Sequence, residues 1–291
     1  MGLTIGTNYA GSNKVTSQSV KGHTNPFQSY TAKNDAIKAP VRYTQADAYV
    51  TNNAKKDLDR IQTEYAKIKR LYAEASVNYI IETDKHKPRN TDTSRLTNKI
   101  IDAANYAGVS ADSIACIVKR ETHFKQSSIN VYTGKGPMGL TNIAIKDLYV
   151  RPQVFDTKLK SLIKEYGSLS KLFAAKKANP SIDLGNLGEI LYRHGSWTNL
   201  RNAIRKDYDL NLKVGSYIYK YQLNRAMANN KVSIANKEKE AFKNYNGCSY
   251  IKQNYANSSV ATLKAARAAA SQDEKYLAAL NKSHKNLKSI A

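Results

Sequence analysis

Apolar residues recur every three or four positions near both ends of the chain. Between Thr44 and Glu82 this spacing persists over several heptads and places one apolar stripe along a helix. The helix ends before Pro88, which cannot continue it. The pattern therefore predicts a long amphipathic helix over residues 43–87, with the stripe Ala54, Leu58, Ile61, Tyr65, Ile68, Tyr72, Ala75 and Tyr79.

A second stripe with the same spacing predicts a C-terminal helix over residues 258–291. Asp273 interrupts its apolar run, and its alanines bury little surface. The two terminal helices could pair with each other, could join the protein to a second copy or another protein, or could each lie on the domain between them. The stripe consists of Leu263, Ala266, Ala270, Asp273, Leu277, Leu280, His284 and Leu287.

Residues 91–257 show the pattern of many short helices, which makes the predicted fold class mainly α. Asp156 is a suitable N-cap for a helix that Gly167 would stop, and Ser168 can begin the next one. Alternating strand patterns are scarce, and the best short candidate is residues 129–132. Residues 1–42 are rich in Ser, Thr, Asn and Gly without sustained periodicity, which indicates a flexible leader.

The charge of the chain is strongly basic, with 46 Lys and Arg against 23 Asp and Glu and a net charge of +23. Such a surface attracts polyanions, including nucleic acid, anionic membranes and acidic cell-wall polymers. However, no more than two basic residues are adjacent, unlike the clustered tract of a nucleic-acid-binding arm, so we expect no nucleic-acid partner. No apolar stretch approaches the roughly 18 residues of a membrane span, and no secretory signal is visible in the first twenty residues.

One carboxylate lies on a helix face that is otherwise apolar. Ser110 to Ser113 can cap a helix over Ile114–Phe124, and Glu121 falls on its apolar face. Burial disfavours the ionised form and raises the pKa of a carboxyl group, as a general acid near neutral pH requires. Alternatively, Glu121 lies at the edge of the stripe and pairs with a neighbouring base. The apolar face comprises Ile114, Ile117, Val118 and Phe124.

A glycine-rich segment follows at residues 134–142. Gly134, Gly136 and Gly139 match the spacing of a dinucleotide-binding fingerprint, but the strong preceding strand and the parallel sheet that this motif needs are missing. We therefore interpret the segment as a turn that brings backbone close to a ligand.

Four short segments occur in the order of the motifs of a known family. They resemble the E-S-x-F, G-x-x-G-L-M-Q, N-I-x-x-G and A-Y-N-x-G motifs of the soluble lytic transglycosylase family, which is goose-type-lysozyme-like. The resemblance covers about residues 95–250, slightly over half of the chain. It implies a lysozyme-like catalytic domain over residues 91–257 that cleaves the MurNAc–GlcNAc backbone of peptidoglycan. The segments are Glu121-Thr122-His123-Phe124, Gly136-Pro137-Met138-Gly139-Leu140-Thr141-Asn142, Asn211-Leu212 with Gly215, and Ala241-Phe242-Lys243-Asn244-Tyr245-Asn246-Gly247.

Position by position, the resemblance implies that Glu121 is the single catalytic acid and base. Thr122 stands where the family usually has Ser and keeps a hydroxyl for the substrate. Gly139 and Leu140 keep the turn that borders the substrate cleft.

The remaining positions depart from the family's pattern in part. Thr141 and Asn142 replace Met and Gln, and Asn142 retains a shorter amide for sugar contacts. Tyr245 and Asn246 match the Tyr-Asn pair that lines the cleft beside the glutamate. The segment from Ile143 to Tyr208 is longer than the family's usual link.

The distribution of acids favours transglycosylation. Glycosidases typically use two carboxylates, but after Glu121 the next acid is Asp147. One glutamate suffices when the MurNAc 6-hydroxyl attacks and forms a 1,6-anhydro end. The alternatives are a lysozyme-type muramidase that hydrolyses the same bond, and a non-catalytic glycan-binding or assembly protein on the same fold. A nucleic-acid binder ranks third because only the net charge suggests it.

We expect no cofactor and no metal, because the five histidines never pair at the spacing of metal ligands. Cys116 and Cys248 lie near two of the motifs, and they are either unpaired or joined in a disulfide. A peptidoglycan substrate implies the cell envelope, in the periplasm or outside the cell, with an export route that the sequence does not reveal.

Overall fold

A computed structural model describes residues 45–125, 136–246 and 251–288 of the chain, with side chains from Ala54 to Asn286 within these ranges. These ranges hold twelve α-helices, two short 3-10 helices and no strand, in agreement with the predicted mainly α class. The chain divides into two units after Asn52, and all that follows concerns the unit from Asn53 onward. The predicted leader at 1–42 and the candidate strand at 129–132 lie outside the described residues.

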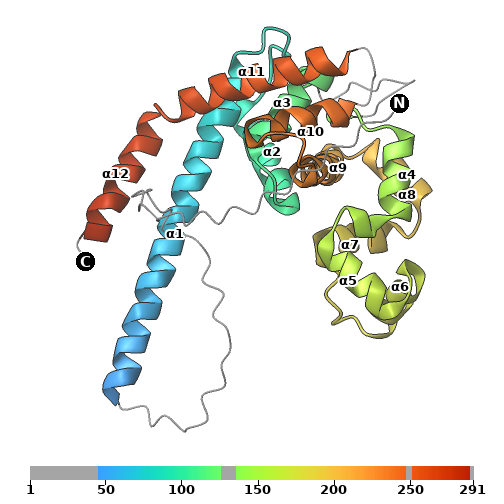
Figure 1. The fold of residues 1–291 in the computed structure, drawn as a ribbon, viewed down its shortest axis with the longest axis horizontal. Coiled ribbons are helices and arrows are strands. Elements are labelled where there is room, and N and C mark those ends of the chain that lie inside the picture. The colour runs from blue at the N-terminus through green and yellow to red at the C-terminus, as the bar shows by residue number, and fades with distance from the viewer. Residues whose placement is uncertain (1–44, 126–135, 247–250, 289–291) are drawn as a thin grey trace, which may run out of the picture. The chain divides into compact units, whose positions relative to one another are not determined.

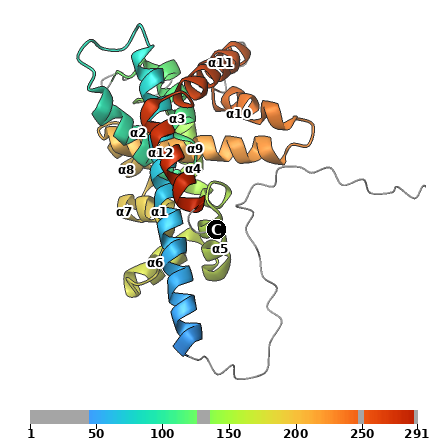
Figure 2. The same cartoon turned by 90° about the vertical axis from the view of Figure 1, so that its left-hand side faces the viewer.

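The long N-terminal helix α1 (Gln45–Glu82) packs against the C-terminal helix α12 (Glu274–Lys288) (Figure 1). The rings of Tyr72 and Tyr276 meet edge to face at 5.3 Å, and the side-chain amide of Asn286 donates to Glu64 at 2.7 Å. Because Glu64 meets residue 286 and Tyr72 meets residue 276, the two helices run antiparallel (Figure 2). The two terminal helices thus contact each other within one chain, but Leu58, Tyr65 and Leu277 of the predicted stripes are exposed.

The structure divides the predicted C-terminal helix in two. Helix α11 (Lys252–Ala270) begins earlier than residue 258 and ends before a short turn, after which α12 begins. The Asp273 carboxylate accepts a hydrogen bond from the backbone N–H of Tyr276 at 3.0 Å, so this residue caps α12. The acid that interrupts the apolar stripe therefore marks a helix boundary.

Helix α3 (Ala111–Thr122) is the central element of the hydrophobic core, because all its residues from 111 to 118 are buried. It contacts α2 (Thr93–Ala107) and α11. The Asp92 carboxylate caps α2 through the N–H of Arg95, and Gly108 ends it with a φ of 73°. The burial of this part of α3 explains why its residues 114–118 are all apolar.

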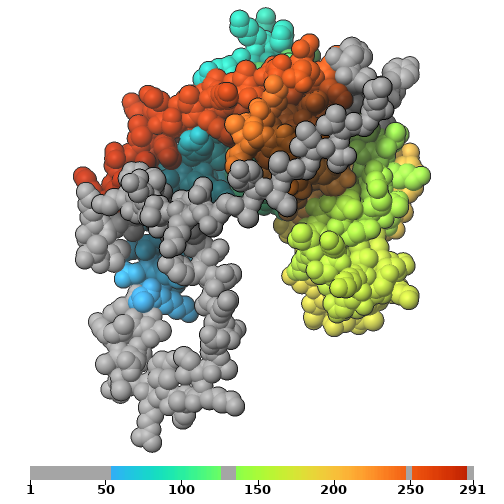
Figure 3. Space-filling model, in the orientation of Figure 1, coloured from blue at the N-terminus to red at the C-terminus, as the bar shows by residue number. Residues whose placement is uncertain are grey.

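Helices α9 (Tyr208–Ala228) and α10 (Lys237–Asn246) pack against each other and join α2 and α11 around the core. The rings of Tyr219 and Phe242 stack at 5.4 Å between them. A 3-10 helix, η2 (Ile234–Asn236), joins the two. Figure 3 shows α10 and α11 side by side at the surface of this unit.

The segment between the second and third motifs forms a group of short helices. Helix α5 begins and ends, and α6 begins, at the predicted signals: Asp156 accepts from the N–H of Leu159, Gly167 adopts a φ of 84°, and Ser168 accepts from the N–H of Lys171. The group comprises α4 (Asn142–Val150), η1 (Pro152–Val154), α5 (Thr157–Tyr166), α6 (Leu169–Ala178), α7 (Gly185–His194) and α8 (Trp197–Ile204).

No helix in the described parts of the chain has the length and apolar character to cross a membrane.

Candidate active site

Glu121 lies in the last turn of α3, and its residue surface is partly exposed. The helix ends directly after it, because His123 and Phe124 both adopt left-handed backbone conformations with φ of 51° and 61°. Such conformations are unfavourable for residues other than glycine, so the surrounding structure must hold them. The side chain of Phe124 is buried in the core and fixes this end of the helix.

A second anchor holds the end of α3 from the loop after α1. The imidazole Nδ1 of His123 lies 3.1 Å from the Asp84 carboxylate, which is almost fully buried. The same carboxylate accepts from the backbone N–H of His86, and the rings of His86 and His123 meet edge to face at 4.8 Å. His123 is thus bound to the loop and not directed along the apolar face of α3. The described residues contain no group of three or more His, Cys, Asp or Glu suited to a metal ion.

The glycine-rich turn packs directly against the Glu121 carboxyl group. Gly139 has a φ of 61°, and a Cβ atom there would overlap the Glu121 carboxyl oxygens. Its N–H donates to the carbonyl of Gly136 at 3.0 Å, which closes the turn. Glycine is therefore required at residue 139 both for the backbone conformation and for the approach of the carboxyl group.

The third motif supports the same turn from α9. The side-chain oxygen of the fully buried Asn211 accepts from the backbone N–H of Met138 at 3.0 Å. A Cβ at Gly136 would overlap the Asn211 side chain, and a Cβ at Gly215 would overlap Met138. The second and third motifs therefore form one packed unit, in which the polar Asn211 satisfies a backbone donor of the turn.

Two tyrosines complete the surroundings of Glu121. The Tyr245 hydroxyl, from the fourth motif on α10, donates to the carbonyl of Met138 at 2.8 Å. The Tyr255 hydroxyl, from α11, is buried next to the Glu121 carboxyl group and interacts with it. Burial, and in addition the charge of Glu121, raises the pKa of both tyrosines well above the ordinary value, so both keep their protons.

Sequence reasoning missed Tyr255, which lies beyond the last motif. Tyr255 belongs to a run of inward-facing positions at helical spacing on α11 that continues with Ser259 and Leu263. This spacing signals burial of the residue, but it does not signal proximity to Glu121, which depends on how α11 crosses α3. Its ring also contacts the Arg120 guanidinium, 5.6 Å from the ring centroid.

The protein around Glu121 favours the protonated carboxyl group. Burial raises the pKa of Glu121, and the Tyr255 hydroxyl and the Arg120 charge oppose this effect only in part. Among the described residues, no other Asp or Glu contributes to the pKa of Glu121. The segment 126–135, which lies outside them, carries no Asp or Glu in its sequence. The predicted raised pKa of Glu121 is therefore confirmed in direction.

The other predicted site residues differ in how far they are exposed to solvent. The Thr122 hydroxyl is buried and donates to the carbonyl of Val118 at 3.1 Å, so it joins the end of α3 to its own helix instead of facing a substrate. Leu140 is buried below the turn.

The residues that follow the turn begin α4. The Thr141 hydroxyl caps this helix by accepting from the N–H of Ala144 at 3.1 Å, and Asn142 is exposed at its first position. At the other side of the site, Asn246 is the last residue of α10 and is partly exposed. Of the two side-chain amides, that of Asn142 belongs to the more exposed residue.

The cysteines contribute nothing to this site in the described residues. Cys116 is free and fully buried in α3, and burial raises the pKa of its thiol. An inert, buried thiol behaves as a small apolar side chain. Cys248 lies outside the described residues.

The chain matches no protein-family model, no curated protein and no solved structure. The resemblance described above therefore depends on the four short segments alone. What the structure adds is that all four segments, far apart in sequence, contribute residues around Glu121 and the turn at 136–140.

Proposed function

We propose that this protein is a peptidoglycan lytic transglycosylase with Glu121 as its acid and base. The observation that carries the proposal is the packing of a partly exposed glutamate with a raised pKa against Gly139, between the turn and two tyrosines. A carboxyl group that stays protonated at higher pH than usual can donate its proton to a leaving oxygen. The proposed fold of the domain at 91–257 is lysozyme-like.

In the proposed reaction, Glu121 first protonates the glycosidic oxygen between MurNAc and GlcNAc. The bond to the anomeric carbon breaks, and the resulting carboxylate then accepts the proton of the MurNAc 6-hydroxyl. That hydroxyl oxygen bonds to the anomeric carbon and closes the 1,6-anhydro ring, so no water is consumed. The single-carboxylate environment of Glu121 in the described residues supports this route over hydrolysis, which typically uses a second carboxylate.

The basic surface and the substrate fit one location. A net charge of +23 would hold the protein on anionic wall polymers. We propose the cell envelope, in the periplasm or outside the cell, as its location because the proposed substrate lies there.

A non-catalytic glycan-binding or assembly protein is the second candidate. One observation favours it: the Thr122 hydroxyl is buried and donates to the carbonyl of Val118, so it is not available to orient a sugar. Such a protein would bind peptidoglycan without releasing soluble fragments.

Fragment release separates the two candidates. The wild type should release soluble fragments from purified insoluble peptidoglycan, and Glu121→Gln should slow release by at least about a hundredfold while still sedimenting with the glycan. The matched control is Glu165→Gln, an exposed acid on α5, which should keep wild-type activity. Full activity in Glu121→Gln would remove Glu121 from the mechanism, and binding without any release by the wild type would favour the second candidate.

A further inference from the structure

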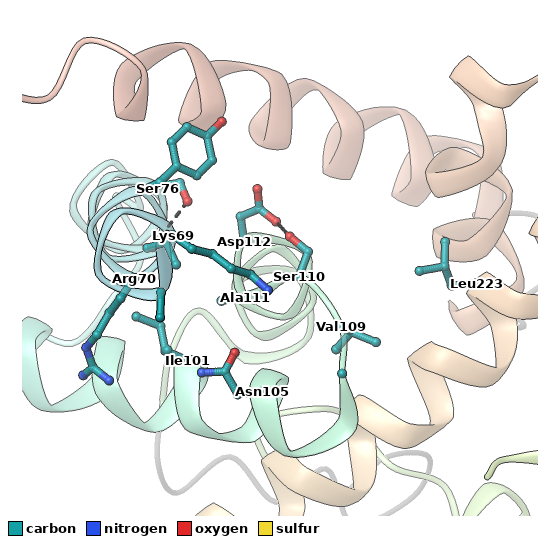
Figure 4. A pocket seen from close by; sticks show the side chains of 14 residues that line it. Lys69, Arg70, Ser76, Ile101, Asn105, Val109, Ser110, Ala111, Asp112 and Leu223 are labelled. Carbon is teal, nitrogen blue, oxygen red and sulfur yellow. Dashed lines mark hydrogen bonds between the residues drawn. The ribbon is translucent and has the colours of Figure 1, made fainter. Parts of the chain in front are cut away.

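A cavity of about 770 Å³ lies between α1, α2 and the start of α3, apart from the candidate active site (Figure 4). Its apolar lining comes from four helices, α1, α2, α3 and α9, and from the turn between α2 and α3. A volume of this size is typical of sites for small molecules. The main apolar residues that line it are Ala66, Ala73, Ile101, Val109, Ala111 and Leu223.

The cavity carries positive charge that the described protein leaves without a counter-ion. Lys69 extends from α1 across the cavity toward Ser110 and Ala111 (Figure 4), and it makes no ion pair or hydrogen bond with the described residues. A further cation, the Lys220 ammonium, lies near Gly108 and over the ring of Tyr217, and it forms no ion pair with the described residues. A second lining cation, Arg70, is held by Glu74 and Asn98.

Asp112, the one acid among the described lining residues, does not neutralise this charge. Its carboxylate accepts from the Arg267 guanidinium at 2.8 Å and from the backbone N–H of Ser113 at 2.8 Å. Because Asp112 is paired with Arg267, Lys69, which is exposed at the rim of the cavity, has no counter-ion among the described residues. The Asn105 side-chain amide also lines the cavity without a hydrogen-bond partner among the described residues.

The cavity and the candidate active site lie at opposite ends of α3. Ser110 and Asp112 border the cavity at the start of the helix, whereas Glu121 lies in its last turn. A helix rises by about 1.5 Å per residue, so roughly 15 Å separates the two positions along the axis. A ligand in the cavity would therefore be separate from the glycan bond that is cleaved at Glu121.

We propose that this cavity binds an amphipathic anion of the alkyl phosphate type, with its phosphate at Lys69 and its hydrocarbon chain on the apolar wall. The phosphate of such a ligand matches the cationic part of the lining, and its hydrocarbon chain matches the apolar part. An unpaired ammonium attracts the phosphate, and burial of the chain against Ile101, Val109 and Leu223 supplies the hydrophobic contribution. The site is independent of the proposed glycan cleavage.

The test measures binding of dodecyl phosphate, below its micelle concentration, to the full chain by calorimetry. The wild type should bind one equivalent. Inorganic phosphate, which lacks the chain, and dodecyl maltoside, which lacks the charge, should each bind at least tenfold more weakly. Equal binding of dodecyl maltoside would overturn the role of Lys69, and equal binding of inorganic phosphate would overturn the role of the apolar wall.

Two variants locate the site. Lys69→Gln removes the charge, and Ala66→Phe fills the cavity from an exposed position on α1; each should weaken binding at least tenfold with unchanged circular dichroism. The matched control is Lys56→Gln, an exposed lysine on the same helix, which should bind as the wild type does. The proposal is overturned if the wild type does not bind, or if either cavity variant keeps wild-type affinity.

Discussion

Glu121 is the residue at which stability and the proposed chemistry conflict. Its carboxyl group is largely removed from water, and this burial raises its pKa more than the Tyr255 hydroxyl and the Arg120 charge lower it. An ionised Glu121 therefore costs folding free energy that an ordinary surface glutamate does not. Conflicts of this kind are typical of functional sites, where a strained or desolvated group is kept for its chemistry.

The stability of Glu121→Gln should depend on pH in a defined direction. Below the unfolded-state pKa, near about 4.3, both states of the wild type hold the proton and the variant gains nothing. As the pH rises toward the raised folded-state pKa, the unfolded wild type loses its proton first, so the wild type loses about 1.4 kcal/mol for each unit by which the pKa is raised. Urea unfolding from pH 4 to 8 should show the variant becoming progressively more stable than the wild type.

The control for this measurement is Glu165→Gln, whose carboxyl group is exposed. Its unfolding free energy should follow that of the wild type at every pH. A constant difference between Glu121→Gln and the wild type over the whole range would contradict the raised pKa.

The close contact of Gly139 with Glu121 leads to a second prediction for a single residue. Gly139→Ala should destabilise the protein by more than the roughly 1–2 kcal/mol cost of a left-handed residue with a side chain, because the new Cβ overlaps the Glu121 carboxyl group. Gly195→Ala is the matched control, because Gly195 has a similar φ of 65° and no atom within 4 Å of the place that a Cβ would occupy. Thermal unfolding should show a larger loss for Gly139→Ala; equal losses would mean that the contact with Glu121 is absent.

At the scale of the helix, Lys237 holds the end of α9. Its ammonium is buried and donates to the carbonyls of Ala226, Met227 and Asn229 at 2.7–3.2 Å. The last carbonyls of a helix lack partners within the helix, so a cation placed there satisfies them. This interaction fixes α9 relative to α10, and α9 carries the Asn211 that supports the turn beside Glu121.

Lys237→Met should therefore lower the unfolding free energy by roughly 1.5–3 kcal/mol, the net value of hydrogen bonds to a charged group. Lys264→Met, an exposed lysine on α11, should change it by less than about 0.5 kcal/mol. The measurement is urea unfolding at neutral pH. A loss in Lys237→Met no larger than that of the control would show that water satisfies these carbonyls equally well.

The sequence predicts the ends of a helix most accurately where the residues that set them lie within a few positions of each end. The boundaries of α5 and α6 followed from Asp156, Gly167 and Ser168, because caps and glycine stops act within a few residues. The break between α11 and α12 was missed, because an acid in a heptad stripe can lie at its edge or begin a new helix. Only the hydrogen bond from the N–H of Tyr276 to Asp273 decides between these outcomes.

At the scale of the whole chain, the site depends on contacts that no local pattern encodes. Glu121 was found from its place on an apolar helix face, and the turn at 136–140 from its glycines. The proximity of Tyr255 arises from the crossing of α11 over α3, and the buried position of the Thr122 hydroxyl arises from the packing of the turn on α3. Both require the assembled fold.

The most direct test of the account is the mass of the products formed from purified peptidoglycan in water labelled with heavy oxygen. Transglycosylation consumes no water, so the wild-type protein should release fragments that end in 1,6-anhydro-MurNAc, each lighter by one water than a hydrolysed fragment and free of the label. Glu121→Gln should release none above background. Fragments with reducing ends that carry the heavy oxygen would identify a hydrolase and contradict the proposed reaction.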